Sequence, residues 1–211
     1  MKTTQLITLC FLFIQHNVRC QFYWQNFTTE NIFYDIEQVE DDMWFATQGG
    51  LIKYHIPTGE RENFLPYNSP VKGSEIVSLA KSPDGSLWVG SNGGGIYKYK
   101  DGIWTNFKDH VNEEHNTSTN ITVVSNDEIW FYLQKGQNTV FNRLYRLKDN
   151  TFKEFTGFAL DAKGWTFMDF AFKDSDNLWL IYRDQISIYN ITQEKTITTY
   201  DKTLFTSDKY S

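Results

Sequence analysis

The sequence predicts an all-β protein of the β-propeller class, and three observations carry this prediction. A tryptophan recurs at Trp44, Trp88, Trp130 and Trp179, at intervals of 44, 42 and 49 residues. Each tryptophan follows a turn rich in Asp, Asn or Ser, and each is followed by a second short strand. A period in the forties with four short strands per unit is typical of propeller blades.

The clearest unit runs from residue 82 to residue 99. Asp84-Gly85 is a tight-turn dipeptide, because glycine accepts the positive φ that a two-residue hairpin needs. Leu87 to Ser91 is a short apolar strand around Trp88, Asn92 to Gly95 is a second turn, and Ile96 to Tyr99 is a second strand. The unit therefore reads turn, strand, turn, strand.

The same order places four strands, A to D, in each of four blades, at about 31–64, 74–107, 120–155 and 165–200. Strand A is expected at 32–39, 75–80, 121–124 and 167–172, and strand B carries the tryptophan. Strand C is expected at 51–54, 96–99, 144–147 and 186–189. Strand D ends in an aromatic residue each time, at Phe64, Phe107, Phe155 and Tyr200. We expect the tryptophans to pack between blades, because a ligand site would not need the same residue in every blade.

A further strand of type D is expected at 22–28, ahead of the first complete unit. Trp24-Gln-Asn-Phe27 matches Trp104-Thr-Asn-Phe107 closely. Propellers close their ring by completing a blade with a strand from the other terminus. The fourth unit already has its own strand D, so the first strand has no place in a four-blade ring. The pattern favours an incomplete or truncated ring, and the alternative is a closed four-blade ring with a spare strand.

Residues 1–20 are expected to be a signal peptide, followed by propeller repeats over 21–211. Lys2 precedes an apolar core of nine residues at 6–14, too short to span a bilayer, and the expected cut follows Cys20. The alternatives are lipidation of Cys20 and an uncleaved anchor. No other stretch is apolar enough to cross a membrane, so the sequence predicts an exported protein, periplasmic or secreted, with no membrane span in the mature chain.

Charge and cysteine content exclude several classes of function. Cys10 and Cys20 are the only cysteines, so the mature chain has no thiol, disulfide or cysteine metal site. Without residues 1–20 the chain has 18 basic and 26 acidic residues, a net charge of −8. An excess of acidic residues spread along the chain argues against binding to nucleic acid or to anionic membrane surfaces.

The sequence contains no catalytic motif. His110-Val-Asn-Glu-Glu-His115 groups two imidazoles and two carboxylates, but this is not the spacing of a known zinc site, and a solvated loop is the simpler interpretation. Asn92 to Gly95 is rich in glycine, yet no helix follows it, so it is read as a hairpin turn and not as a phosphate cradle. We therefore expect no catalytic residue, no metal and no cofactor.

The repeat resembles a known family. Residues 76–99 are similar to the two-component regulator propeller repeat, and Thr28-Thr-Glu-Asn31 is similar to that family's entry segment. The resemblance covers nearly all of 22–200, is close in the first two blades and weakens in the last two. It implies the periplasmic sensor region of a hybrid two-component histidine kinase of Bacteroidetes-like bacteria. Such regions respond to glycans, and a membrane helix and a kinase would lie downstream.

The expected function is a non-catalytic, extracytoplasmic ligand-binding sensor module, with an oligosaccharide or a protein as the ligand. The alternatives are a secreted scaffold for protein–protein interaction and, less favoured, a propeller lyase or quinoprotein-type enzyme. Binding residues are expected on the loops that join strand D to A and B to C. The candidates that could stack on sugars or anchor a protein are Tyr67, His110, His115, Phe158 and Trp165. The ring is expected to be completed by an oligomer or by further blades.

Overall fold

The structure is a computed structural model, and it describes residues 32–73, 75–107, 117–135, 141–158 and 168–204. These residues form strands, turns and loops, with one short turn of 3₁₀ helix at Lys202–Leu204. The all-β class predicted from the sequence is confirmed. The expected signal peptide (1–20) and N-terminal strand (22–28) lie outside the described residues.

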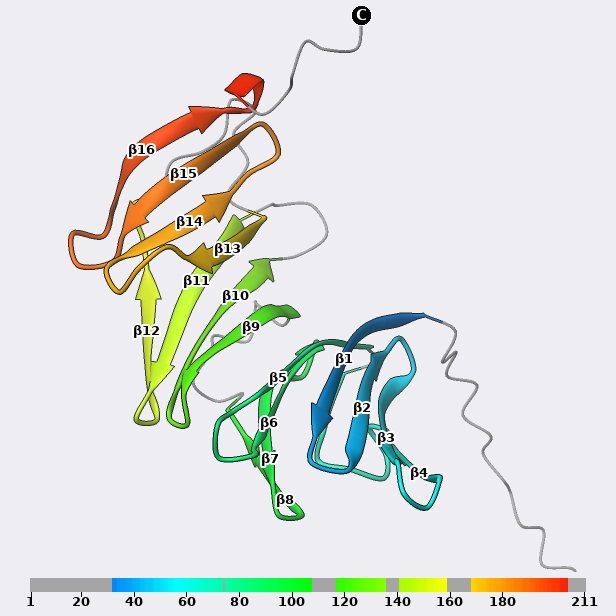
Figure 1. Ribbon diagram of the computed structural model, residues 1–211. Coiled ribbons are helices and arrows are strands. Elements are labelled where there is room, and N and C mark those ends of the chain that lie inside the picture. Colours follow the sequence, from blue (N-terminus) through cyan, green and yellow to red (C-terminus); the bar gives the residue numbers. More distant parts are fainter. Residues whose placement is uncertain (1–31, 74, 108–116, 136–140, 159–167, 205–211) are drawn as a thin grey trace, which may run out of the picture.

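The strands form four antiparallel blades, each entered at its innermost strand and left at its outermost (Figure 1). Blade 1 consists of β1 (Phe33–Val39), β2 (Asp42–Thr47), β3 (Gly50–His55) and β4 (Glu60–Phe64). Blade 2 consists of β5 (Glu75–Lys81), β6 (Leu87–Asn92), β7 (Gly95–Lys100) and β8 (Ile103–Asn106). Blade 3 consists of β9 (Thr117–Ser125), β10 (Glu128–Lys135), β11 (Phe141–Lys148) and β12 (Thr151–Phe155). Blade 4 consists of β13 (Asp169–Phe172), β14 (Asn177–Ile181), β15 (Gln185–Asn190) and β16 (Lys195–Asp201).

The blades pack face to face, so the core consists of three separate layers between neighbouring blades. The face that carries the tryptophan is called here the trailing face of its blade, and the opposite face is called the leading face. Trp44, Ala46 and Leu51 of blade 1 pack with Leu87, Val89 and Tyr97 of blade 2. Equivalent layers join blade 2 to blade 3 and blade 3 to blade 4. Each joint therefore pairs a trailing face with the leading face of the next blade.

The aromatic residue at the end of strand D has a structural role that the sequence pattern did not reveal. In every blade its ring contacts the tryptophan of the same blade, with centroids 4.7–6.0 Å apart. The pairs are Trp44–Phe64, Trp88–Phe107, Trp130–Phe155 and Trp179–Tyr200. Aromatic pairs at this separation stabilise beyond the area that they bury. The pair ties the outermost strand to the middle of each blade.

The predicted packing of the tryptophans between blades holds for three of the four. Trp44, Trp88 and Trp130 are buried to 1%, 2% and 1% exposure. Trp179 is only partly buried, and it lies on the side of blade 4 that faces away from blade 3, because its neighbours Leu178 and Leu180 occupy the joint. The same residue in the same place of the repeat therefore differs in burial, because no described blade covers it.

A second repeated feature is a cation opposite each buried tryptophan on the neighbouring strand. Lys53, Lys98 and Arg146 pair in register with Trp44, Trp88 and Trp130, and each cation lies 5.1–5.8 Å from the ring centroid. A cation over an aromatic ring is attracted to it, so this contact stabilises both side chains in the layer between two blades. Blade 4 lacks this cation, because Ile188 is the residue that pairs in register with Trp179.

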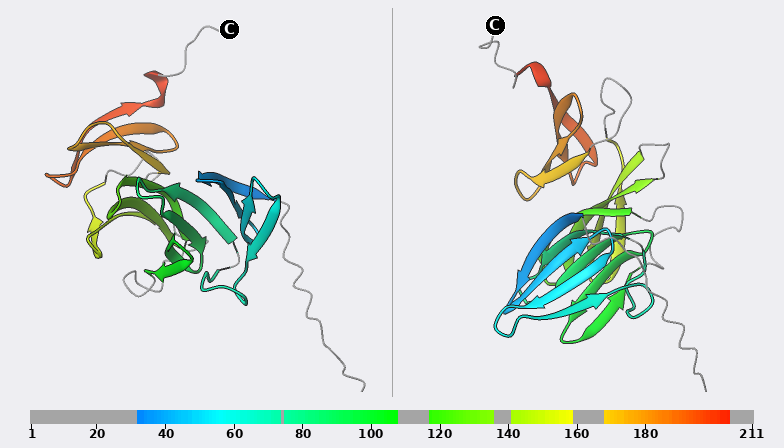
Figure 2. Two further views of the ribbon diagram at one scale, coloured as in Figure 1. Left: turned by 60° about the horizontal axis from the view of Figure 1, so that its bottom comes forward. Right: turned by 90° about the vertical axis from the view of Figure 1, so that its right-hand side faces the viewer.

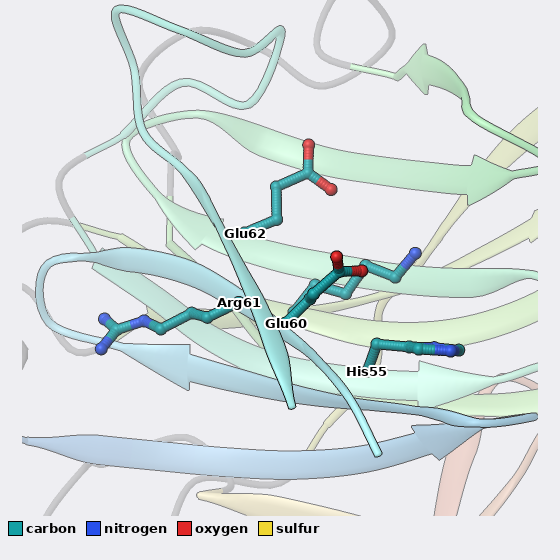
Figure 3. Close-up of a pocket in the computed structure, with 5 residues that line it drawn as sticks. His55, Glu60, Arg61 and Glu62 are labelled. Atoms are coloured by element: carbon teal, nitrogen blue, oxygen red, sulfur yellow. The ribbon is translucent and has the colours of Figure 1, made fainter. Parts of the chain in front are cut away.

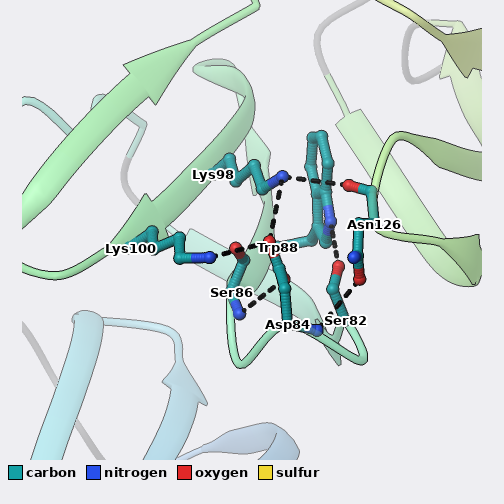
Figure 4. Close-up of polar contacts among 7 residues, drawn as sticks. All are labelled: Ser82, Asp84, Ser86, Trp88, Lys98, Lys100 and Asn126. Carbon is teal, nitrogen blue, oxygen red and sulfur yellow. Dashed lines mark hydrogen bonds and ion pairs between the residues drawn. The ribbon is translucent and has the colours of Figure 1, made fainter.

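The turn between β5 and β6 forms a polar network that crosses into blade 3 (Figure 4). The Asp84 carboxylate accepts a hydrogen bond from the Ser86 N–H at 3.0 Å and forms an ion pair with Lys100 at 3.0 Å. The Asp84 N–H donates to the Asn126 side-chain oxygen at 2.9 Å, and Lys98 donates to the Asn126 carbonyl at 2.9 Å. The turn therefore holds the hairpin of blade 2 and also fastens blade 2 to blade 3.

Asp84→Asn is expected to lower the free energy of unfolding by about 1–2 kcal/mol at pH 7. Burial raises the pKa of Asp84, but the Ser86 N–H and the ammonium groups of Lys100 and Lys98 outweigh it and lower the pKa to about 2. A lowered carboxylate pKa stabilises the fold above the unfolded-state pKa, and this contribution is lost as pH falls through the folded-state pKa. Urea unfolding of the wild type and of Asp84→Asn should show a difference in the free energy of unfolding at pH 7 that becomes smaller toward pH 2.

Asp101→Asn is the matched control, because Asp101 is an exposed turn residue whose positive φ of 49° suits asparagine equally well. It should change the stability by less than about 0.5 kcal/mol at either pH. If Asp84→Asn lowers the free energy of unfolding by the same amount at pH 7 and near pH 2, the charge of Asp84 does not stabilise the turn.

The four described blades follow one another in an open row, with blade 1 and blade 4 at opposite ends (Figures 1 and 2). Blades 2 and 3 are joined by one register pair, Asn92 with Thr117, and the Asp35 carboxylate accepts a hydrogen bond from the Leu79 N–H between blades 1 and 2. The ring is not closed, so the expectation of an incomplete ring is confirmed over the closed four-blade alternative. No described blade covers the leading face of blade 1 or the trailing face of blade 4.

Candidate functional site

The loop between blade 1 and blade 2 is held in one shape by its own polar groups. The Asn68 side chain accepts a hydrogen bond from the Leu65 N–H at 2.6 Å and donates to the Asn63 carbonyl at 2.9 Å. The Ser69 hydroxyl donates to the Leu65 carbonyl at 2.9 Å. The Lys72 ammonium donates to the carbonyls of Pro66 and Ser69, so the loop is closed on itself along its whole length.

Tyr97 of β7 fixes this loop on blade 2. Its hydroxyl accepts a hydrogen bond from the Lys72 N–H at 2.8 Å and donates to the Gly94 carbonyl at 2.8 Å. Burial raises the pKa of Tyr97 and outweighs the opposing hydrogen bond at Lys72, so the hydroxyl stays neutral over the physiological range. Loop and hairpin turn approach so closely that Gly94 has no space for a side chain beside the Lys72 carbonyl.

The fixed loop and the outer strands of blades 1 and 2 enclose a groove of about 620 Å³. Its lining combines one cation, one carboxylate, two amides and two aromatic rings: Arg61, Glu62, Asn63, Phe64, Asn68, Ser69, Pro70 and Trp104. Trp104 of β8 is partly exposed and packs on Phe64 at 5.5 Å and on Tyr99 at 4.7 Å. This set of residues is called the outer groove below.

A second pocket of about 570 Å³ adjoins the outer groove and shares Arg61 and Glu62 with it (Figure 3). Its other lining residues are Lys53, His55 and Glu60. Arg61 points away from the remaining four, because it alternates with Glu60 and Glu62 along β4 (Figure 3). The two pockets form one polar surface on the outside of blade 1.

Asp42 anchors the charged wall of this second pocket. Its carboxylate lies 2.9 Å from the Lys53 ammonium and 2.7 Å from the Nδ1 atom of His55. Burial raises the pKa of Asp42, but the hydrogen bonds from Lys53 and His55 outweigh it, so the pKa is lower than usual. His55 is the one histidine that the structure describes, and its partner is this carboxylate and no hydroxyl nucleophile.

The predicted site residues do not come together in one place. Tyr67 lies on the fixed loop and is 68% exposed, next to the outer groove but outside its lining. Phe158 packs on Tyr189 of blade 4, with ring centroids 4.8 Å apart, and adjoins the core between blades 3 and 4. His110, His115 and Trp165 lie outside the described residues. The binding role predicted for these five residues stays a prediction.

The outer groove was not predicted from the sequence, although one signal pointed toward it. Strand β4 reads Glu60-Arg-Glu-Asn-Phe64, and only its last residue is apolar. A strand this polar is typical of an exposed edge. The sequence could not show that Trp104, forty residues later, lies beside that edge.

Two kinds of feature are absent from the described residues. Within the described ranges, no three His, Asp or Glu side chains gather in a way that could hold a metal ion. The described part of the chain also contains no helix that could cross a membrane.

Residues 70–93 match the family described as Two component regulator propeller. The match runs from the end of the fixed loop through β5 and the Asp84-Gly85 turn to the end of β6. No curated protein sequence matches this chain.

Solved structures of propellers resemble the fold. The extracellular domain of the putative hybrid two component system BT3049 from B. thetaiotaomicron is 22% identical, with a TM-score of 0.56, and the likeness covers 81% of this chain and 22% of that chain. The corresponding domain of BT4673 from the same organism is 14% identical, with a TM-score of 0.59 over 80% of this chain and 23% of that chain. PorZ, a surface component of the type-IX secretion system of Porphyromonas gingivalis, is 13% identical, with a TM-score of 0.58 over 81% of this chain and 28% of that chain.

This chain spans less than a third of the length of each of these three structures. At this level of identity the likeness shows the fold, and the family match shows the repeat. The chain is therefore a β-propeller, in an incomplete ring, that carries a repeat of the two component regulator propeller family at residues 70–93.

Proposed function

We propose that the chain is a non-catalytic, exported ligand-binding module of a sensor, and that its ligand is an oligosaccharide held in the outer groove. The observation that carries the sensor role is the family match at residues 70–93, and the outer groove beside this repeat is where the described residues offer a ligand the most varied polar and aromatic lining. Two of the similar structures are extracellular domains of putative two component systems, which supports a sensor on the outside of the cell.

The groove offers the groups that bind sugars. A partly exposed indole provides an apolar face with a polar edge, and Trp104 is in this position. Arg61 and Glu62 are exposed planar groups on opposite sides of β4, and each can donate or accept two hydrogen bonds at once. Asn68 and Ser69 are used to shape the loop, so the groove needs little ordering when a ligand binds.

A glycan array followed by calorimetry tests the proposal. The chain should bind a defined oligosaccharide, and Arg61→Ala should weaken that binding by about 10- to 100-fold, because a hydrogen bond to a charged group is lost. Tyr67→Ala is the matched control, since Tyr67 is exposed on the adjoining loop but outside the groove. It should leave the affinity within about twofold.

Two other outcomes would contradict the proposed place of the site or the proposed ligand. Binding that depends on Tyr67 and not on Arg61 would move the site to the loop face predicted from the sequence. If the chain bound no glycan on the array, the proposal that its ligand is an oligosaccharide would be wrong.

A scaffold for protein–protein interaction is the second candidate, and the open apolar blade faces favour it. Phe33 and Ile36 of β1 are 60% and 54% exposed, and Ile181 of β14 is 39% exposed. Exposed apolar patches commonly mark contact surfaces. A silent glycan array, together with a purified protein ligand whose binding is lost on replacing Ile36, would favour the scaffold.

Export is tested by the mature N-terminus. Secretion with a cut after Cys20 would give a chain that begins at Gln21, which mass spectrometry of the intact protein would detect. A lipid on Cys20 would overturn simple secretion in favour of an anchored protein.

A further inference from the structure

The side chain of Glu62 lies on the side of β4 that faces blade 2. It pairs in register with Lys53 of β3, and Phe64 follows it two residues later on the same side of the strand. The Phe64 ring packs on Trp104 of β8 in blade 2, with centroids 5.5 Å apart. Glu62 and Trp104 therefore line the outer groove from two facing blades.

This side of β4 carries more negative than positive charge. Glu60 shares it with Glu62, and both side chains are exposed. Among the described residues that line the two pockets, Lys53 is the one permanent cation on this side, because Arg61 points the other way (Figure 3). The Lys53 ammonium already lies 2.9 Å from the Asp42 carboxylate. Three carboxylates therefore share one ammonium group.

The indole of Trp104 gives the outer groove a fixed aromatic surface beside this charge. The ring packs on Tyr99 with centroids 4.7 Å apart and on Phe64, and it stays partly exposed. The face of an indole attracts a cation, and a carboxylate accepts strong hydrogen bonds from an ammonium group. A carboxylate or sulfate group on a ligand would instead be repelled by the glutamates.

Blade 1 itself shows how an indole and a carboxylate hold an ammonium group together. The ammonium of Lys53 lies 5.6 Å from the centroid of the Trp44 ring and 2.9 Å from the Asp42 carboxylate. Trp104 and Glu62 offer the same two chemical groups at the outer groove. Within the part of the chain that the structure describes, no lysine or arginine lies over the Trp104 ring.

We propose that the oligosaccharide of the outer groove contains amino sugars with free, positively charged amino groups, and that one such ammonium group binds between the Trp104 ring and the Glu62 carboxylate. This inference rests on the proposed function and adds the charge of the ligand to it. Arg61, on the opposite side of β4, would contact uncharged hydroxyl groups of the same oligosaccharide.

Calorimetry with two oligomers of equal length tests the charge of the ligand. One oligomer consists of glucosamine with free amino groups, and the other consists of N-acetylglucosamine, which has no charge. All titrations use one buffer in which glutamate is ionised and the free amino groups are protonated. The full exported chain should bind the glucosamine oligomer at least about 10-fold more tightly, because only this oligomer provides charge-assisted hydrogen bonds.

Glu62→Gln tests the place of the ammonium group. It should weaken binding of the glucosamine oligomer by about 10-fold or more and leave binding of the acetylated oligomer within about twofold. The variant should fold, because Glu62 is exposed. Glu40→Gln is the matched control, since Glu40 is exposed in the turn between β1 and β2 and lines neither pocket. It removes the same charge from the same blade and should leave both affinities within about twofold.

The other outcomes separate this inference from the proposed function. If a neutral or acidic oligosaccharide binds and Glu62→Gln leaves its affinity unchanged, the inference is wrong and the proposed function stands. If no oligosaccharide binds, charged or uncharged, both are wrong. An equal loss of affinity in Glu40→Gln would also overturn the inference, because it would indicate general attraction to an acidic chain. Binding of a lysine-rich peptide through Glu62, without binding of the glucosamine oligomer, would overturn it in favour of a protein ligand.

Discussion

Trp130→Ala is expected to lower the free energy of unfolding by about 3–5 kcal/mol, whereas Trp179→Ala should cost about 1 kcal/mol. The two residues hold the same position in their blades, and both contact the last aromatic residue of their own sheet. Trp130 is 1% exposed and also meets Phe172 of blade 4 at 5.5 Å. Its removal would leave a cavity between blades 3 and 4, whereas Trp179 would leave mainly solvent-facing surface.

The measurement is urea unfolding of both variants at low protein concentration, so that the stability of a single copy is compared. Trp130→Phe is the control for specific packing, because it keeps an apolar ring beside Phe155, and it should recover part of the loss. Equal losses for the two alanine variants would contradict the open face of blade 4.

Much of the fold could be predicted, because each blade repeats the same short sequence pattern and the residues that pack between blades belong to that pattern. The spacing of Trp44, Trp88, Trp130 and Trp179 fixed the number of blades, since each tryptophan marks the second strand of a sheet. The aromatic end of strand D was visible in the sequence, but its contact with the tryptophan was not. Pairing between distant strands depends on register, which the sequence pattern leaves open.

The candidate site was far less predictable. The sequence predicts binding residues among the aromatic side chains on loops, yet Phe158 packs on Tyr189, because an aromatic residue on a loop can face either solvent or core with the same local sequence. The outer groove exists because the ends of β4 and β8 flank one fixed loop, and no local pattern links Arg61 to Trp104. The difference in burial of Trp179 also has no local signal, because it depends on which neighbour its blade has.

Gly94→Ala is expected to lower the free energy of unfolding by about 3 kcal/mol. A Cβ on Gly94 would overlap the Lys72 carbonyl oxygen and lie 2.5 Å from its carbonyl carbon, and backbone cannot move aside as a flexible side chain can. Gly93→Ala is the matched control, because a Cβ there meets nothing within 4 Å, although its φ of 83° is unfavourable for alanine. It should cost only about 1 kcal/mol.

The same pair of variants tests whether the loop shapes the outer groove. In Gly94→Ala the loop must move away from the hairpin turn, which strains the hydrogen bonds between Lys72, Tyr97 and Gly94. Pro70 and Ser69 line the groove from this loop, so a ligand bound there should be held more weakly, while Gly93→Ala keeps the wild-type affinity. Limited proteolysis should likewise cut within 65–73 faster in Gly94→Ala than in Gly93→Ala, because protease access follows local opening. Equal stability, cleavage and affinity for the two variants would mean that the close approach of loop and turn does not hold the loop in place.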